Sequence, residues 1–242
     1  MSLKDKRIVI TGGARRVGRS LALAVAQAGA EVVIHYNQSR GDVESLQAEI
    51  GAMGGKSELI QADLSDPAQV DGLIAQAVKT GPLFAVINNA AIFEPLTWES
   101  AGVEDWNRTL MINLLAPFQL SRAFMKSLKP EATGRIVNLL DWRALRPGAD
   151  HLPYTVSKSA LAALTKSLAI AFAPRVTVNG LALGAILPPV DRQPAGDAAI
   201  KGLPAQRWAT LEEVGQALIF LLDGPAYITG EIIHVDGGRH LV

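Results

Sequence analysis

Residues 7–18 of the chain read RIVITGGARRVG, an apolar run of strand type that ends in a glycine-rich turn. Residues 20–28 follow with the 3.6-residue periodicity of a helix. Glycines between a strand and a helix let the backbone approach a pyrophosphate and aim the helix N-terminus at it. The stretch therefore predicts a dinucleotide-binding turn, and the alternative is a simple strand-to-helix turn.

The same alternation of strands and helices continues along the chain. We expect strands at residues 7–11, 31–35, 56–61, 84–88, 135–140, 177–181 and 232–235, and helical segments that include 20–28, 68–78 and 157–172. Ser65-Asp66-Pro67 is typical of a helix start. Regular alternation favours right-handed crossovers. We therefore predict an α/β fold of Rossmann type: a single domain, residues 1–242, with a doubly wound seven-stranded parallel sheet and helices on both faces.

Composition narrows the classes of function. Hydrophobic residues form 49% of the 242 residues, enough for a sizeable core, and 23 basic side chains balance 23 acidic ones. This balance gives no electrostatic reason to expect nucleic acid or an anionic membrane as a partner. The sequence has no cysteine, so disulfides and thiolate metal sites are excluded, and we expect no metal. It also lacks a signal peptide and an apolar run of roughly 20 residues, so we expect a cytoplasmic protein.

Three residues in the middle of the chain have the spacing of a catalytic group. Asp141 ends an apolar strand, Tyr154 follows it after thirteen residues, and Lys158 follows Tyr154 by four. Residues four apart share one face of a helix. An ammonium beside a phenol stabilises the phenolate and lowers the tyrosine pKa from roughly 10. We therefore expect Tyr154 to act as a general acid in a reduction, and the alternative is that the pair is structural.

These motifs resemble those of the short-chain dehydrogenase/reductase family over essentially the whole chain. Besides Tyr154 and Lys158, the resemblance includes the turn at 11–18 and the run Asn88-Asn89-Ala90-Ala91. It implies that a nicotinamide supplies hydride, that Lys158 also binds the nicotinamide ribose, and that Asn113 continues a proton relay through water. The alternative for Asn113 is a buried asparagine that satisfies helix backbone. Because the family is commonly tetrameric, we expect a homotetramer.

The end of the second strand indicates which nicotinamide cofactor is used. Residues 33–40 read VIHYNQSR, with no carboxylate before Asp42 to hold a ribose 2′-hydroxyl. Donors to a 2′-phosphate are available instead from His35, Asn37, Ser39 and the nearby Arg15 or Arg40. NADP(H) is therefore favoured. Asp63 is placed to bond the adenine amine, and local capping of the next helix is the alternative.

Asp141 stands where most of the family has a serine. An ionised carboxylate there would repel a carbonyl oxygen that gains negative charge, so ordinary ketone reduction should suffer. A carboxyl group can instead accept from a ring N–H or, if burial raises its pKa, pass a proton through Tyr154 to a ring nitrogen. This position therefore favours imine-type reduction of a heterocycle.

The same departures mark one subgroup that the chain resembles, the pteridine reductases and bacterial dihydromonapterin or dihydrofolate reductases. Its Thr-Gly-xxx-Arg-x-Gly pattern is met at 11–18, with Arg16 in place of the middle glycine, and its His-Tyr-x-x-Ser segment at 35–39. The resemblance implies that a pterin stacks between the nicotinamide and Phe93, with Arg16 on the pterin and a cofactor phosphate. Asp141 and Tyr154 would contact the ring nitrogens. The alternatives are a core role for Phe93 and a surface role for Arg16.

Taken together, these patterns give a full set of expected contacts. For the cofactor they are Gly12, Arg15, Arg16, Val17, His35, Tyr36, Asn37, Ser39, Ala62, Asp63, Leu64, Asn89, Ala90, Ala91, Leu139, Tyr154, Lys158, Gly184 and Ile186. Residues 184–202 are a candidate substrate lid, with a plain surface excursion as the alternative. Trp142 and Arg143 are placed to narrow the pocket, and Arg239 to contribute to a neighbouring subunit's site.

We therefore predict an NADPH-dependent reductase of a dihydropterin or dihydrofolate-type substrate, in which the proton passes through Tyr154 and Asp141. The first alternative is a reductase of the same fold that acts on an oxoacyl thioester or another ketone. The second belongs to a different class of protein, a non-catalytic NADP(H) sensor that binds the nucleotide and a protein partner.

Overall fold

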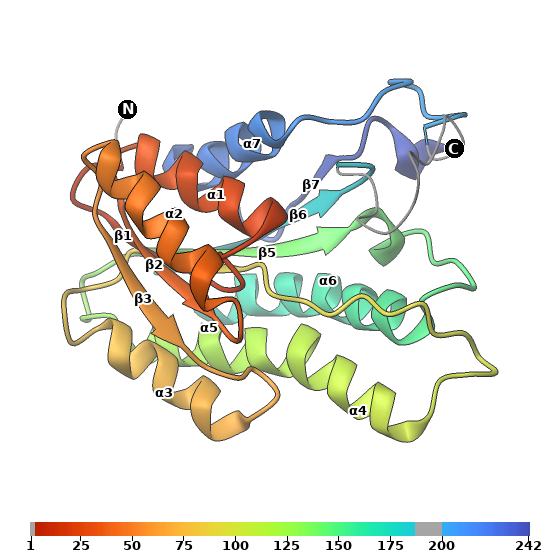
Figure 1. Ribbon diagram of the computed structural model, residues 1–242, viewed down its shortest axis with the longest axis horizontal. Coiled ribbons are helices and arrows are strands. Elements are labelled where there is room, and N and C mark those ends of the chain that lie inside the picture. The colour runs from red at the N-terminus through yellow and green to blue at the C-terminus, as the bar shows by residue number, and fades with distance from the viewer. Residues whose placement is uncertain (1–2, 187–199) are drawn as a thin grey trace.

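Seven parallel strands form one sheet in the order β3-β2-β1-β4-β5-β6-β7 (Figure 1). The computed structural model describes residues 3–186 and 200–242. Its strands are β1 (Arg7–Ile10), β2 (Glu31–Tyr36), β3 (Ser57–Gln61), β4 (Ala85–Asn88), β5 (Gly134–Asp141), β6 (Val176–Leu183) and β7 (Ile232–Val235). The predicted strands and the parallel sheet are confirmed, with strand ends that differ by one or two residues.

Helices cover both faces of this sheet. One face carries α1 (Arg16–Gln27), α2 (Arg40–Ala52) and α7 (Leu211–Asp223) (Figure 1). The other side carries α3 (Pro67–Ala77), α4 (Val103–Leu110), α5 (Ala116–Ser127) and α6 (Leu152–Phe172) (Figure 1). Each face has its own large apolar cluster. The central strands β1 and β4 are buried throughout, which explains why they read as short apolar runs without alternation.

Helices α3 and α6 both begin close to predicted site residues. Helix α3 begins at Pro67, as predicted, because the Asp66 carboxylate accepts the N–H of Ala68 at 2.9 Å and caps the helix. Helix α6 begins at Leu152, five residues before the predicted segment. Tyr154 therefore lies in the first turn of the helix and Lys158 follows on the same helix, as the Tyr-xxx-Lys spacing predicts.

The strand ends form two edges with different chemistry. β1 and β4 are neighbours although β2 and β3 come between them in sequence, so the strand order reverses at this point. Ligands of doubly wound sheets bind beyond the C-terminal ends of the strands at such a reversal. The glycine turn after β1 and the residues that end β4, β5 and β6 all lie at that edge.

The expected lid falls largely on residues 187–199, which lie outside the described residues. Within 3–186 and 200–242, no helix has the length and apolar character needed to cross a bilayer.

Candidate active site

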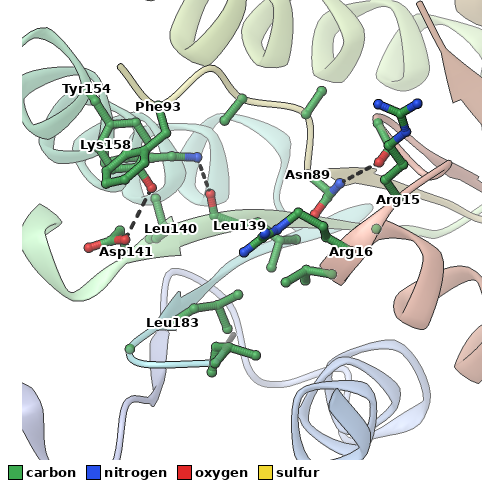
Figure 2. Close-up of a pocket in the computed structure, with 17 residues that line it drawn as sticks. Arg15, Arg16, Asn89, Phe93, Leu139, Leu140, Asp141, Tyr154, Lys158 and Leu183 are labelled. Carbon is green, nitrogen blue, oxygen red and sulfur yellow. Dashed lines mark hydrogen bonds between the residues drawn. The ribbon is translucent and has the colours of Figure 1, made fainter. Parts of the chain in front are cut away.

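A cavity of about 720 Å³ opens at the C-terminal edge of β1, β4, β5 and β6 (Figure 2). It brings together most of the predicted contacts, namely Gly12, Arg15, Arg16, Val17, Asn89, Ala90, Ala91, Phe93, Leu139, Asp141, Tyr154, Lys158, Gly184 and Ile186. Gly18, Leu140 and Leu183 also line it. The other predicted contacts, His35, Tyr36, Asn37, Ser39, Ala62, Asp63, Leu64 and Asn113, do not line this cavity.

The glycine turn is hydrogen-bonded to the residue after β4, and its small residues leave space for a ligand. Gly12 has a φ of +62°, in the left-handed region that favours glycine. A Cβ on Gly18 would lie 2.1 Å from the carbonyl oxygen of Gly12, so only glycine fits there. The Asn89 side-chain amide donates to the carbonyls of Thr11 and Gly12 at 2.8 and 3.1 Å. This rigid cradle at the start of α1 suits the pyrophosphate of a dinucleotide.

Arg16 takes a strained conformation in this turn. Its φ is +51°, where a residue other than glycine costs roughly 1–2 kcal/mol. Figure 2 shows its guanidinium turned toward the cavity, whereas that of the neighbouring Arg15 points away. Strained residues of this kind cluster at functional sites, where the surrounding structure holds them in place. The geometry therefore favours a ligand-binding Arg16 over a surface arginine that merely tolerates the turn.

His35 lies inside the protein and not on the cofactor side of the turn. Its Nδ1 accepts the N–H of Gly12 at 3.1 Å, so its Nε2 carries the proton and donates to the carbonyl of Ala62 at 2.9 Å. Burial lowers the pKa of His35, which keeps this neutral tautomer. The arrangement contradicts the prediction that His35 donates to a 2′-phosphate. Instead, its ring connects the glycine turn to the end of β3.

Other predicted phosphate and adenine contacts have local partners. Arg15 pairs with Asp42 at 2.6 Å and Arg40 with Glu44 at 2.8 Å, in both cases on the exposed surface. Exposed pairs of this kind are worth about 0–1 kcal/mol and are easily exchanged for a phosphate, so Arg15 stays a predicted contact. The Asp63 carboxylate accepts from the N–H and the hydroxyl of Ser65, both at 2.8 Å. This agrees with a local role for Asp63, although the helix cap itself is the neighbouring Asp66.

Three of the four residues expected to act in catalysis, Asp141, Tyr154 and Lys158, meet between the end of β5 and the first turns of α6 (Figure 2). The Tyr154 hydroxyl donates to Asp141 Oδ2 at 3.2 Å, and the second Asp141 oxygen accepts the N–H of Arg143 at 2.9 Å. The Lys158 ammonium donates to the carbonyl of Leu139 at 2.7 Å. Tyr154 and Lys158 are buried, with 9% and 3% of their surfaces exposed. Strand and helix thus bring acid, phenol and ammonium to one end of the cavity.

Burial shifts the proton affinities of all three groups. It raises the pKa of Asp141, against the opposing effects of the Arg143 N–H and of the Arg143 and Lys158 charges. It lowers the pKa of Lys158 to about 8. Burial and then the neighbouring Asp141 raise the pKa of Tyr154 well above its usual value, so the prediction that Lys158 lowers it is wrong for this arrangement. At neutral pH the phenol therefore keeps its proton, as a general acid requires.

Asn113 lies in a π-helical turn, Met111–Leu115, between α4 and α5. Its side-chain oxygen accepts the N–H of Ile92 at 2.9 Å, and its amide donates to the carbonyl of Ile92 at 3.0 Å and to Ser157 at 3.1 Å. Asn113 thus connects the loop after β4 to α6. The alternative, in which Asn113 satisfies the backbone of a helix, does not describe these contacts. π-helical turns are frequent at functional sites. The predicted proton relay stays a prediction.

Sequence reasoning missed a group that supports Phe93. The ring of His151 stacks on Phe93 with centroids 3.9 Å apart and an interplanar angle of 6°, and Tyr154 meets Phe93 edge-on at 4.6 Å. His151 has a φ of +51°, and its Nδ1 lies 3.1 Å from Asp150, which forms two hydrogen bonds with Arg143. Phe93 is 54% exposed, so it is not core filler. Nothing in the sequence signalled this stack beyond the pair Asp150-His151 shortly before Tyr154.

Comparisons with known proteins identify the family. The profile described as "Enoyl-(Acyl carrier protein) reductase" matches residues 12–240. The chain belongs to the short-chain dehydrogenase/reductase family. It is 32% identical over 234 residues to the 3-oxoacyl-[acyl-carrier-protein] reductase of Synechocystis sp.. The aligned region covers 95% of each chain. The predicted family is therefore confirmed, and the protein is an oxidoreductase.

Two solved structures are similar to nearly the whole chain. FolM alternative dihydrofolate reductase 1 from Brucella canis, complexed with NADP, is 34% identical with a TM-score of 0.92, covering 100% of this chain and 97% of that one. Blue fluorescent protein from a metagenomic library, in complex with NADPH, is 32% identical with a TM-score of 0.91, covering 98% and 99%. The FolM structure fits the pteridine reductase-like subgroup predicted from the sequence.

Proposed function

We propose that this protein reduces a dihydropterin or dihydrofolate-type substrate with NADPH, adding hydride to a ring carbon and a proton to the adjacent nitrogen. The predicted cofactor, NADP(H), is confirmed by structural neighbours that hold NADP or NADPH. The glycine cradle after β1 fits its pyrophosphate, and the exposed Arg15 suits its 2′-phosphate. When bound, NADPH supplies the hydride.

The observation that carries the proposal is the hydrogen bond from Tyr154 to Asp141. Tyr154 donates its proton to a ring nitrogen, and Asp141 restores that proton because burial raises the pKa of its carboxyl group. A carbonyl oxygen that gains negative charge would be repelled by an ionised Asp141 only 3.2 Å from the phenol oxygen. A ring nitrogen is basic enough to accept a proton as hydride reaches the adjacent carbon, so an Asp141 carboxyl that returns the proton to Tyr154 suits it.

Other side chains hold the two reactants. Lys158, fixed by its bond to Leu139, lies beside Tyr154, where the family resemblance places the nicotinamide ribose. Arg16 offers a guanidinium to the pterin and a cofactor phosphate, which bidentate contacts of arginine suit. Phe93 provides an exposed flat ring supported by His151, on which a bicyclic heterocycle can stack.

Reduction of a ketone is the second candidate, because one observation favours it. The curated relatives include 3-oxoacyl-[acyl-carrier-protein] reductases from Synechocystis sp. and, at 29% identity over 100% of both chains, from Escherichia coli. On this hypothesis Asp141 is merely tolerated at the serine position. The homotetramer and the cytoplasmic location stay predictions.

Replacement of Asp141 by serine separates the two functions. Turnover of NADPH should be measured with dihydrobiopterin, dihydromonapterin, dihydrofolate and simple ketones, from about pH 5 to pH 8. We expect Asp141→Ser to lower pterin turnover by at least about 100-fold, because proton delivery is worth that much. Wild-type pterin turnover should also fall as pH rises through the raised pKa of Asp141.

The matched control is Asp71→Ser on the exposed side of α3, which removes a carboxylate far from the cavity. It should leave both activities unchanged. Brisk wild-type turnover of ketones with none of any pterin would reject the proposal in favour of the second candidate, and a gain of ketone turnover in Asp141→Ser would support that outcome.

A further inference from the structure

A second cavity, of about 440 Å³, lies beside the active site and carries only positive side-chain charges. Arg146, Lys201 and Arg239 line it, together with Trp142 and neutral residues. No aspartate or glutamate is among the lining residues that the structure describes. The chain as a whole has balanced charges, so this is a local excess of cations. Val242 also lines the cavity.

The cationic cavity is built from three separate segments of the chain. The Arg239 guanidinium lies over the ring of Trp142, 4.6 Å from its centre, and Arg143 lies over the same ring at 4.9 Å. Arg146 reaches across and donates to the carbonyl of Arg239 at 3.4 Å. These contacts bring the turn after β5 and the C-terminal turn together at the wall of the cavity.

The charges in the cavity differ in their partners. Arg143, just outside it, is neutralised by two hydrogen bonds to Asp150. Among the residues described, Arg146 and Lys201 have no carboxylate partner. Two neighbouring cations, Arg146 and Lys201, that have no carboxylate partner among the described residues favour binding of an external anion.

The position of this cavity relative to Asp141 indicates which molecule carries the anionic group. Trp142 directly follows Asp141, and consecutive Cα atoms are about 3.8 Å apart. Asp141 lines the first cavity and Trp142 the second, so residues adjacent in sequence at the end of β5 line the two cavities. A single extended substrate can therefore place its ring at Asp141 and an anionic tail among the cations.

We propose that the cationic cavity binds the carboxylates of a glutamyl tail, so that the preferred substrate is a dihydrofolate rather than a pterin without a tail. The proposal rests on the proposed function and adds the part of the substrate that the catalytic group does not contact. Arg146 and Lys201 pair with the tail carboxylates, an arginine offering a two-pronged contact and a lysine a point charge. The Trp142 ring lines the proposed tail site.

The test compares substrates that share a ring and differ in the tail. KM and kcat are measured with dihydrofolate, dihydrobiopterin and a phosphorylated dihydropterin for Arg146→Ala and Lys201→Ala. We expect each variant to raise KM for dihydrofolate about fivefold, with kcat unchanged, because an exposed ion pair contributes that much. KM for dihydrobiopterin should not change. Arg146→Lys should restore most of the loss, since it keeps the charge.

Two controls identify the source of each effect. Lys79→Ala removes an exposed cation just beyond α3 and should leave every KM unchanged. Binding of the isolated fragment p-aminobenzoylglutamate, measured by calorimetry, should weaken in Arg146→Ala. A larger effect on the phosphorylated pterin than on dihydrofolate would assign the cavity to phosphate and overturn the glutamyl tail.

The two proposals can fail separately. If wild-type protein reduces dihydrobiopterin and dihydrofolate but Arg146→Ala and Lys201→Ala leave the ratio of their KM values unchanged, the tail site is wrong and the pterin reductase stands. If wild-type protein reduces no pterin, the proposed function fails first.

Discussion

The two edges of the sheet use charged residues in opposite ways. At the N-terminal edge, Arg7 is buried, with 5% of its side chain exposed, and it forms ion pairs with Glu31 on β2 and Glu58 on β3. At the C-terminal edge, Asp141 and Lys158 are also largely buried, yet in the structure as described they form no ion pair with each other. At the N-terminal edge the buried Arg7 is thus paired with carboxylates. At the C-terminal edge the pKa values of Asp141 and Lys158 are shifted by burial.

This difference separates stability from function. A buried charge that is fully paired contributes to the integrity of the fold, and removal of its partner leaves a buried charge uncompensated. Buried groups without such a partner keep perturbed pKa values, which is the condition for moving protons at neutral pH. The comparison predicts that substitutions at the first edge change unfolding and that those at the second change catalysis.

The largest effect on stability is expected at Arg7. Arg7→Met removes the guanidinium that binds Glu31, Glu58 and the carbonyl of Gly81. We expect the free energy of unfolding to fall by about 3 kcal/mol, because two partly buried carboxylates lose their partner. Urea denaturation measures it. At a temperature where the variant is folded, its kcat and KM should equal those of the wild type.

Arg40→Met is the matched control for this prediction. Its ion pair with Glu44 has a similar length, 2.8 Å, but both side chains are more than half exposed. An exposed pair one helical turn apart contributes only about 0.3–0.5 kcal/mol, so the denaturation midpoint should hardly move. Equal losses in the two variants would show that burial does not distinguish the edges as argued.

Much of the C-terminal edge could be predicted from the sequence, because the signals are local. A strand that ends in Asp141 and a helix that carries Tyr154 and Lys158 four residues apart must meet if the sheet is parallel. The same reasoning placed the glycine turn and the residues after β4 at one edge. Neither inference needed knowledge of side-chain contacts.

The missed features depend on partners that are distant in sequence. The sequence suggested both His35 and Asn37 as phosphate donors, but tertiary packing buries His35 and pairs its ring with Gly12, after β1, and Ala62, after β3. The stack of Phe93 on His151 joins residues 58 positions apart, and the left-handed backbone of His151 leaves no composition signal. The shifted pKa of Tyr154 also depends on burial, which spacing alone does not give.

A smaller effect, of opposite sign, is expected at Asp141. Burial raises its pKa above the ordinary value of 3.8, so between these two pKa values the folded protein binds more protons than the unfolded chain. The stability contributed by the protonated carboxyl is fully present below pH 3.8 and is lost as pH rises through the folded-state pKa. Asp141→Asn cannot ionise, so its stability relative to the wild type should increase as pH rises.

Denaturation midpoints of wild type and Asp141→Asn, followed from about pH 4 to just below pH 8, measure this divergence. The range stops below pH 8 because burial lowers the pKa of Lys158 to about 8. Above that pH, loss of the Lys158 proton makes stability rise with pH, which is opposite to the effect of Asp141. Parallel curves for the two proteins over this range would mean that Asp141 is ionised without a penalty, and would remove the basis for proton delivery.

A further small change in stability, expected at Arg16, sharpens the comparison most. Its φ of +51° is a conformation that glycine adopts without strain, so Arg16→Gly should raise the free energy of unfolding by about 0.5–1 kcal/mol after the greater chain entropy of glycine is deducted. The same substitution removes a guanidinium that faces the cavity, and we expect KM for the pterin to rise about tenfold. A variant that is more stable and less active would show that the strained backbone of Arg16 is kept because its side chain binds the substrate. Lower stability together with unchanged KM would mean that Arg16 supports the turn and nothing else.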